Sequence, residues 1–172
     1  VLFNRIQLAV IALIGGFITP IMVGGDVENF FMLCSYLLLL NLGMLTVSIF
    51  KKWKIFFIVA YDCTIAMFGG WLYLYHDVFS YSKTSTLIFG TIFYFIFFFG
   101  IVVVNIRQKE LFKGFDYLII LSANSFYFGL GLFLLEPEYR GVFTISLGAM
   151  NGILTLIFFK WKDIDRNFVF LL

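Results

Sequence analysis

Long hydrophobic runs separated by short polar stretches form the main pattern of this chain. Six runs cover residues 6–23, 30–50, 55–75, 84–106, 115–135 and 141–159, and a seventh occupies residues 168–172 at the end of the sequence. A helix needs roughly 20 apolar residues to cross a bilayer, which is close to the length of each of the first six runs. The pattern predicts an all-α integral membrane protein, a polytopic bundle with six full transmembrane helices and a truncated seventh.

The polar stretches between these runs are short, and they predict how successive helices are arranged. Connections of this length leave no room for a domain outside the membrane, so neighbouring helices are expected to be antiparallel hairpins. We therefore predict a single transmembrane helical domain over residues 1–172. Because the sequence starts at Val1 inside one apolar run and stops inside another, we expect it to be a fragment of a longer chain.

Basic residues are divided unequally between alternate connections. One side carries ten of the 12 Lys and Arg residues: Arg5, Lys51, Lys52, Lys54, Arg107, Lys109, Lys113, Lys160, Lys162 and Arg166. The other side carries Lys83 and Arg140. Since Lys and Arg accumulate in short cytoplasmic loops, the N-terminal end is predicted to be cytoplasmic.

Composition supports a membrane protein over the other broad classes. Hydrophobic residues make up 62% of the chain and charged residues 13%, against about 25% charged in soluble domains. The basic residues are explained by topology, so no nucleic-acid partner is predicted. The expected partners are the lipid bilayer and the remaining transmembrane helices of a full-length chain.

Asp62 is the ionisable residue that lies well inside an apolar run. It follows Lys54 by eight residues, or about 12 Å along a helix. A charge at that depth costs roughly 2.5–3.5 kcal/mol on insertion scales, so it needs a partner, a water-filled cavity or a proton. Helical spacing places Ile55, Ala66, Gly69 and Tyr73 on the same face, which suggests contact with another helix. Asp62 is either a proton- or cation-coupled carboxylate or a structural, hydrogen-bonded one.

Three asparagines in other runs are the candidate partners of Asp62. Asn41, Asn124 and Asn151 each lie within a predicted span. With Asp62 they form a candidate intramembrane polar site. The favoured interpretation is helix packing, because intramembrane amides hydrogen-bond between helices. The alternative is a path for a polar substrate that these four residues line.

Glycines at small-xxx-small spacing point to close helix contacts. Gly148 and Gly152 form such a pair in the sixth run, and Gly69 lies on the face of Asp62. Glycines in these positions let helix backbones approach closely, so these three residues are predicted to serve helix packing.

The first run contains a possible helix break. Gly15 and Gly16 are followed by Pro20, which lacks a backbone donor, so the helix is expected to be kinked or unwound at this end. Broken helices build ion sites in secondary transporters, but a simple exit turn explains this segment equally well.

Several short segments resemble a known family. They cover residues 12–20 (ALIGGFITP), 36–45 (YLLLLNLGML), 51–54 (KKWK) and 124–131 (NSFYFGLG). Together they resemble a bacterial family of long, many-span membrane proteins classed as a domain of unknown function. The resemblance implies the middle section of a larger polytopic protein of the bacterial cytoplasmic (inner) membrane. It implies no reaction and no functional residues.

These observations favour one function over two others. We found no phosphate-binding loop, no nucleophile–base pair and no metal-ligand spacing, so we predict no catalytic residues, no cofactor and no metal site. The favoured interpretation is a non-catalytic membrane module of a larger protein. The alternatives are a proton- or ion-coupled transporter or channel element that uses Asp62 and, in last place, an intramembrane enzyme.

Overall fold

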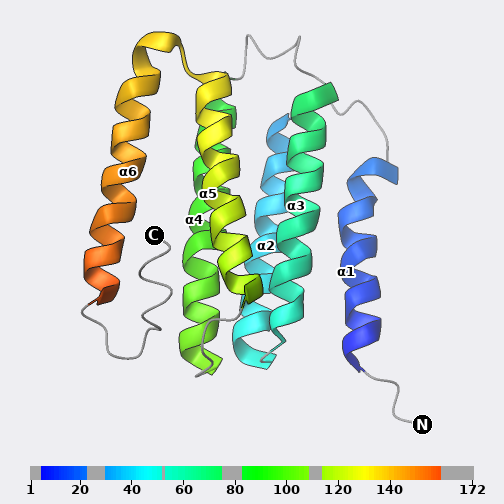
Figure 1. Ribbon diagram of the computed structural model, residues 1–172. Helices are drawn as coiled ribbons and strands as arrows, with labels where there is room; N and C mark the ends of the chain where they lie inside the picture. The colour runs from blue at the N-terminus through cyan, green and yellow to red at the C-terminus, as the bar shows by residue number, and fades with distance from the viewer. Residues whose placement is uncertain (1–4, 23–29, 52, 75–82, 109–113, 160–172) are drawn as a thin grey trace. The chain divides into compact units, whose positions relative to one another are not determined.

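The described residues of this computed structural model are helical, as the sequence predicts (Figure 1). The structure describes residues 5–22, 30–51, 53–74, 83–108 and 114–159. They form the helices α1 (Arg5–Met22), α2 (Phe30–Lys51), α3 (Lys54–Leu74), α4 (Lys83–Gln108), α5 (Gly114–Leu134) and α6 (Pro137–Phe159). The truncated seventh span, predicted over residues 168–172, lies outside the described residues.

Four of these helices are long and apolar enough to cross a membrane: Phe30–Lys51, Lys54–Leu74, Lys83–Arg107 and Gly114–Leu134. In α1 the apolar part is shorter, Ala9–Pro20. The part of the chain that the structure describes is therefore all-helical, with several membrane-spanning candidates.

The contacts divide the chain into two compact units, residues 1–78 and residues 79–172. Helices α1, α2 and α3 belong to the first unit, and α4, α5 and α6 belong to the second. Within each unit, consecutive helices run in opposite directions (Figure 1). Each unit is described by itself below.

In the first unit, α1 packs against both α2 and α3, which also pack against each other. The turn between α2 and α3 is tight: the carbonyl of Trp53 accepts bonds from the Phe56 amide at 3.1 Å and from the Ser48 hydroxyl at 3.3 Å. At the other end of this hairpin the rings of Phe30 and Trp71 lie 4.6 Å apart. Hydrogen bonds to the Trp53 carbonyl thus hold one end of the α2–α3 pair, and an aromatic contact holds the other end.

Helix α1 continues through Pro20 to Met22, so the described helix is not interrupted there. Pro20 has no N–H to donate to the carbonyl of Gly16, one helical turn earlier. The Tyr36 hydroxyl of α2 donates to this carbonyl instead, at 2.6 Å. The Thr19 hydroxyl also donates to the Gly15 carbonyl at 2.8 Å. A neighbouring helix and a threonine therefore satisfy the backbone near the proline, as is usual for prolines in membrane helices.

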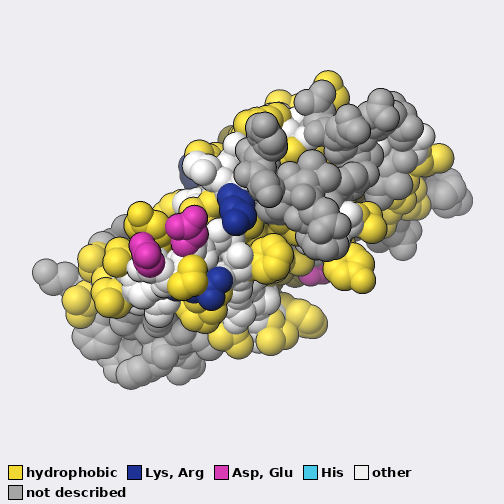
Figure 2. Space-filling model, turned by 90° about the horizontal axis from the view of Figure 1, so that it is seen from above, with side chains coloured by type: hydrophobic (Ala, Val, Ile, Leu, Met, Phe, Trp, Pro, Cys, Tyr) yellow, Lys and Arg dark blue, Asp and Glu magenta, His cyan; other side chains and the backbone are white. Residues whose placement is uncertain are grey.

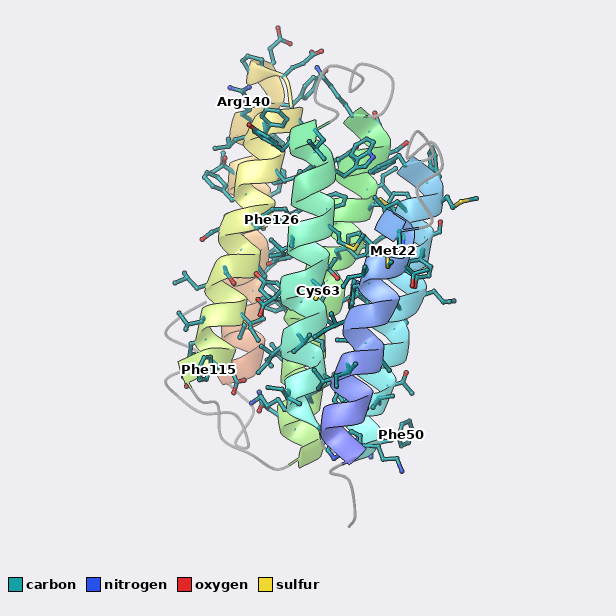
Figure 3. The ribbon with its side chains drawn as sticks, turned by 90° about the vertical axis from the view of Figure 1, so that its right-hand side faces the viewer. Met22, Phe50, Cys63, Phe115, Phe126 and Arg140 are labelled. Atoms are coloured by element: carbon teal, nitrogen blue, oxygen red, sulfur yellow. The ribbon has the colours of Figure 1, made fainter. Side chains whose placement is uncertain are left out.

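In the second unit, α5 packs against both α4 and α6. The α5–α6 turn consists of Leu135 and Glu136, and Phe115 and Arg140 mark the two ends of the hairpin in Figure 3. Pro137 occupies the first helical position of α6, where its missing N–H costs nothing. Helix α6 thus begins four residues before the predicted start at residue 141. Pro137 and Glu138 are residues typical of a loop, but they are equally typical of the first turn of a helix.

Candidate functional site

Asp62 lies on an uncovered face of α3. Its neighbour Cys63 is about midway along the helix (Figure 3). Asp62 is exposed, and so are Ile55, Ala66 and Tyr73, which share its face. The opposite face of α3 is buried and contains Phe56, Phe57, Ala60, Tyr61, Thr64, Phe68 and Trp71. The predicted face therefore exists, but the described residues of the first unit do not cover it.

Asn41 forms a buried pair with Thr64 between α2 and α3. The Asn41 amide nitrogen donates to the Thr64 hydroxyl oxygen at 2.8 Å, and the geometry also allows this hydroxyl to donate to Asn41 Oδ1 at 3.0 Å. The Thr64 hydroxyl lies 2.7 Å from the Ala60 carbonyl of its own helix. Both side chains are 2% exposed. The polar groups thus satisfy each other within the packed interface.

Asn124 and Asn151 are brought together in the second unit. Asn124 Oδ1 accepts from the Asn151 amide at 3.1 Å and from the Tyr94 hydroxyl at 2.9 Å. Both amides also donate to carbonyls of their own helices, those of Ile120 and Leu147. One oxygen atom on α5 therefore connects side chains from all three helices of this unit.

An aromatic stack continues this polar cluster. The rings of Tyr94 and Tyr127 lie 4.6 Å apart and nearly parallel, at 17°. The Tyr127 hydroxyl is 2.9 Å from the Thr91 hydroxyl on α4. The sequence analysis missed Tyr94, Tyr127 and Thr91, as it missed Thr64. The sequence feature that could have identified them is a hydroxyl side chain in the middle of an apolar helix, at the depth of an asparagine on a neighbouring helix.

The four residues of the predicted polar site thus have different surroundings. Asn124 contacts Asn151, Asn41 contacts Thr64, and Asp62 faces outward from α3. A path lined by all four residues remains a prediction, and so does the alternative that they serve only helix packing.

The glycines of the described helices differ in their surroundings. Gly148 and Gly152 are exposed, and a Cβ at either would meet nothing within 4 Å, while Gly69 is half-buried. A Cβ at Gly131 would overlap the Phe143 ring of α6. The helix-packing role of Gly148, Gly152 and Gly69 therefore stays a prediction, and Gly131 packs directly against the Phe143 side chain within the second unit.

Asp116 is a second acidic residue of interest, in the first turn of α5. It is fully buried, as is Asn105 near the end of α4. A carboxylate at a helix N-terminus interacts favourably with the helix dipole. The sequence analysis passed over Asp116 because it lies at the end of an apolar run, where charged residues are common.

Comparison with known proteins places the chain in a family. No curated protein and no solved structure matches it. A family model described as "Predicted membrane protein (DUF2339)" matches residues 1–170, nearly the whole sequence. This match confirms the resemblance drawn from the sequence segments, and membrane localisation agrees with the apolar helices. The chain belongs to this family of predicted membrane proteins, DUF2339, a domain of unknown function.

Proposed function

We propose that the chain is a multi-pass, non-catalytic module of the bacterial cytoplasmic membrane, with six transmembrane helices and a cytoplasmic N-terminal end. It would serve as a packed helical part of a larger protein. The observation that carries the proposal is that polar side chains within the long apolar helices hydrogen-bond between helices, as in Asn41–Thr64 and Tyr94–Asn124–Asn151. Such bonds are typical of helix packing in membranes.

The lengths of α1 and α6, the two helices outside the four long apolar candidates, support six spans. Helix α1 has 18 residues and α6 has 23, which correspond to about 27 Å and 35 Å at 1.5 Å per residue. In α6 the hydroxyls of Thr144 and Ser146 donate to the carbonyls of Arg140 and Val142. Because such internal bonds satisfy the hydroxyl protons, these residues are compatible with a helix in lipid.

The charges at the helix ends support the proposed orientation. Lys51, Lys54 and Arg107 lie at the ends assigned to the cytoplasm, as the positive-inside rule requires. Glu136 and Glu138 lie at the opposite end, beside Arg140, whose Nε donates to the Leu135 carbonyl at 3.0 Å. Figure 2 looks onto the end at which α5 joins α6 and shows charged side chains of both signs at this surface.

The test is topology mapping in intact bacterial cells expressing the full-length protein. Single cysteines replace Lys83 and Arg107, which lie at the two ends of α4. We expect a membrane-impermeant maleimide to label Lys83→Cys in intact cells and Arg107→Cys only after permeabilisation. The same contrast is expected between Glu138→Cys and Lys51→Cys. Labelling of Lys51→Cys in intact cells would contradict the proposed orientation.

A second candidate function is a proton- or ion-coupled transport element that uses Asp62. The exposure of this carboxylate about midway along α3 favours it, because an exposed acid at that depth is compatible with a water-filled cavity. In this case flux through liposomes containing the full-length protein would disappear with Asp62→Asn. If the flux is equal in the wild-type protein and in Asp62→Asn, or absent from both, the non-catalytic module is the better proposal.

A further inference from the structure

The end of α1 is packed less firmly than the part before it. Among the described side chains of this helix, Leu13 and Phe17 are buried, at 4% and 3% exposed. Beyond Phe17 the exposure rises, to 41% for Ile18 and 80% for Met22. Side-chain packing within the first unit therefore fixes α1 as far as Phe17 and contributes little to residues 18–22.

The backbone between these two parts of α1 favours bending. Pro20 has no N–H, so the helical bond that would reach the Gly16 carbonyl is missing. The Thr19 hydroxyl donates to the Gly15 carbonyl at 2.8 Å, and bonds of this kind often bend a helix. Sharp bends in helices occur at prolines and where a side chain inserts into the backbone ladder. Residues 16–20 are therefore the segment at which α1 bends most easily.

One side chain of α2 replaces the missing donor. The Tyr36 hydroxyl donates to the Gly16 carbonyl at 2.6 Å. The helices are close at this point, because a Cβ at Gly16 would meet Leu40 Cδ1 at 3.4 Å and the Tyr36 hydroxyl at 3.9 Å. Since a buried carbonyl without a donor is costly, the Tyr36 bond stabilises the uninterrupted helix. If the Tyr36 hydroxyl turns away, a bend at Pro20 lets the carbonyl turn toward another donor.

We propose that α1 contains a hinge at residues 16–20 and that Tyr36 is the latch that holds the hinge closed. In the latched state, residues 18–22 continue the helix, as this structure shows. In the released state they swing about the hinge, while Leu13 and Phe17 stay packed in the first unit. Release also frees the Tyr36 hydroxyl for another acceptor. The device does not depend on the number of spans or on their orientation, so it goes beyond the proposed function.

The test measures distances between two nitroxide spin labels by pulsed dipolar EPR, in the full-length protein reconstituted in liposomes. One label is attached to Phe50→Cys on α2, and the other to Met22→Cys, beyond the hinge, or to Ile11→Cys, before it. The three native side chains are 79%, 80% and 69% exposed, and Met22 and Phe50 lie at opposite ends of the helices in Figure 3. Cys63→Ala removes a half-buried thiol, and Cys34 is retained because it is fully buried.

We expect two populations in the distances between positions 22 and 50, in a ratio that depends on Tyr36. The latched distance should dominate with Tyr36 present, and Tyr36→Phe should increase the second population several-fold. The distances between positions 11 and 50 should stay narrow and unchanged. Identical distances between positions 22 and 50 with and without Tyr36→Phe would overturn the latch. Broadening of both pairs would mean that α1 leaves α2 as a whole, which would overturn the hinge.

Pro20→Ala distinguishes a hinge from ordinary fraying of a helix end. The alanine N–H can donate to the Gly16 carbonyl, so Tyr36→Phe should no longer increase the second population in this background. An equal increase in both backgrounds would show that the helix end moves independently of the proline, and the proposal would be wrong. Because Tyr36→Phe removes only a hydroxyl group, the packing of the ring is kept. The distance between positions 11 and 50 shows in each variant whether α1 remains packed.

Discussion

The two three-helix units use polar side chains in different ways. In the first unit the bonds are pairwise: Asn41 binds Thr64 between α2 and α3, and Tyr36 binds a backbone carbonyl of α1. In the second unit one atom, Asn124 Oδ1, accepts from both α4 and α6. The pair in the first unit is enclosed, while Asn124 and Asn151 are half-buried.

This difference shows two ways in which helices associate in a membrane, where the hydrophobic effect contributes little to their association. Lipid is as apolar as leucine, so association depends on van der Waals fit and hydrogen bonds between helices. The third helix of the second unit, α6, is mostly exposed and contacts α5 at specific points, such as the Phe143 ring at Gly131. We expect the second unit to be sensitive to steric change and the first to loss of hydrogen bonds.

The largest effect is expected for Gly131→Ala in the second unit. The new methyl group would overlap the Phe143 ring, and overpacking of this kind costs about 1–3 kcal/mol of the free energy of unfolding. The measurement is denaturation in dodecylmaltoside with increasing sodium dodecyl sulfate. Gly129→Ala, where a Cβ meets nothing within 4 Å, is the control and should not destabilise. Equal stability of the two variants would contradict the steric fit.

A somewhat smaller effect is expected for Thr64→Val in the first unit. The variant keeps the shape but leaves the buried Asn41 amide without its partner, which should cost about 1–2 kcal/mol on the same assay. Thr46→Val is the control, because that exposed hydroxyl donates to the Leu42 carbonyl of its own helix. Adding Asn41→Leu to Thr64→Val should restore part of the loss. If Thr64→Val leaves the free energy of unfolding unchanged, the buried Asn41–Thr64 pair does not contribute to stability.

Tyr94→Phe tests whether the second unit behaves as a connected cluster. Losing one of two donors to Asn124 Oδ1 should cost about 0.5–1.5 kcal/mol of unfolding free energy. In an Asn124→Ala background the acceptor is absent, so the same substitution should cost nothing. A double-mutant cycle therefore measures the coupling, and strictly additive effects would mean that the cluster is not a unit.

The smallest effect is expected for Tyr36→Phe, which removes the bond to the Gly16 carbonyl. We expect a loss of about 0.5–1 kcal/mol, because this carbonyl has no helical donor at Pro20. In a Pro20→Ala background the new backbone N–H can donate to the carbonyl, so Tyr36→Phe should then cost less. An equal loss in both backgrounds would show that the tyrosine does not compensate for the proline.

The sequence by itself determined the helical class and most helix ends. The predicted span of residues 30–50 became α2 (Phe30–Lys51), and 55–75 became α3 (Lys54–Leu74). The physical reason is local: in hydrocarbon every backbone group must be satisfied within its own segment, so a long apolar run has one stable form. The start of α6 was missed because Pro137 and Glu138 suit both a loop and a helix N-terminus.

Only the tertiary structure decided which face of each helix is covered and which small or polar residues meet. Gly131 packs against the Phe143 ring, Asn41 pairs with Thr64, and Asp62 points away from its unit. The hydrophobic pattern does not carry this information, since both the lipid-facing and the protein-facing sides of a membrane helix are apolar. Contacts between segments distant in the sequence are set by shape and by hydrogen-bond geometry, which appear only when the helices are packed together.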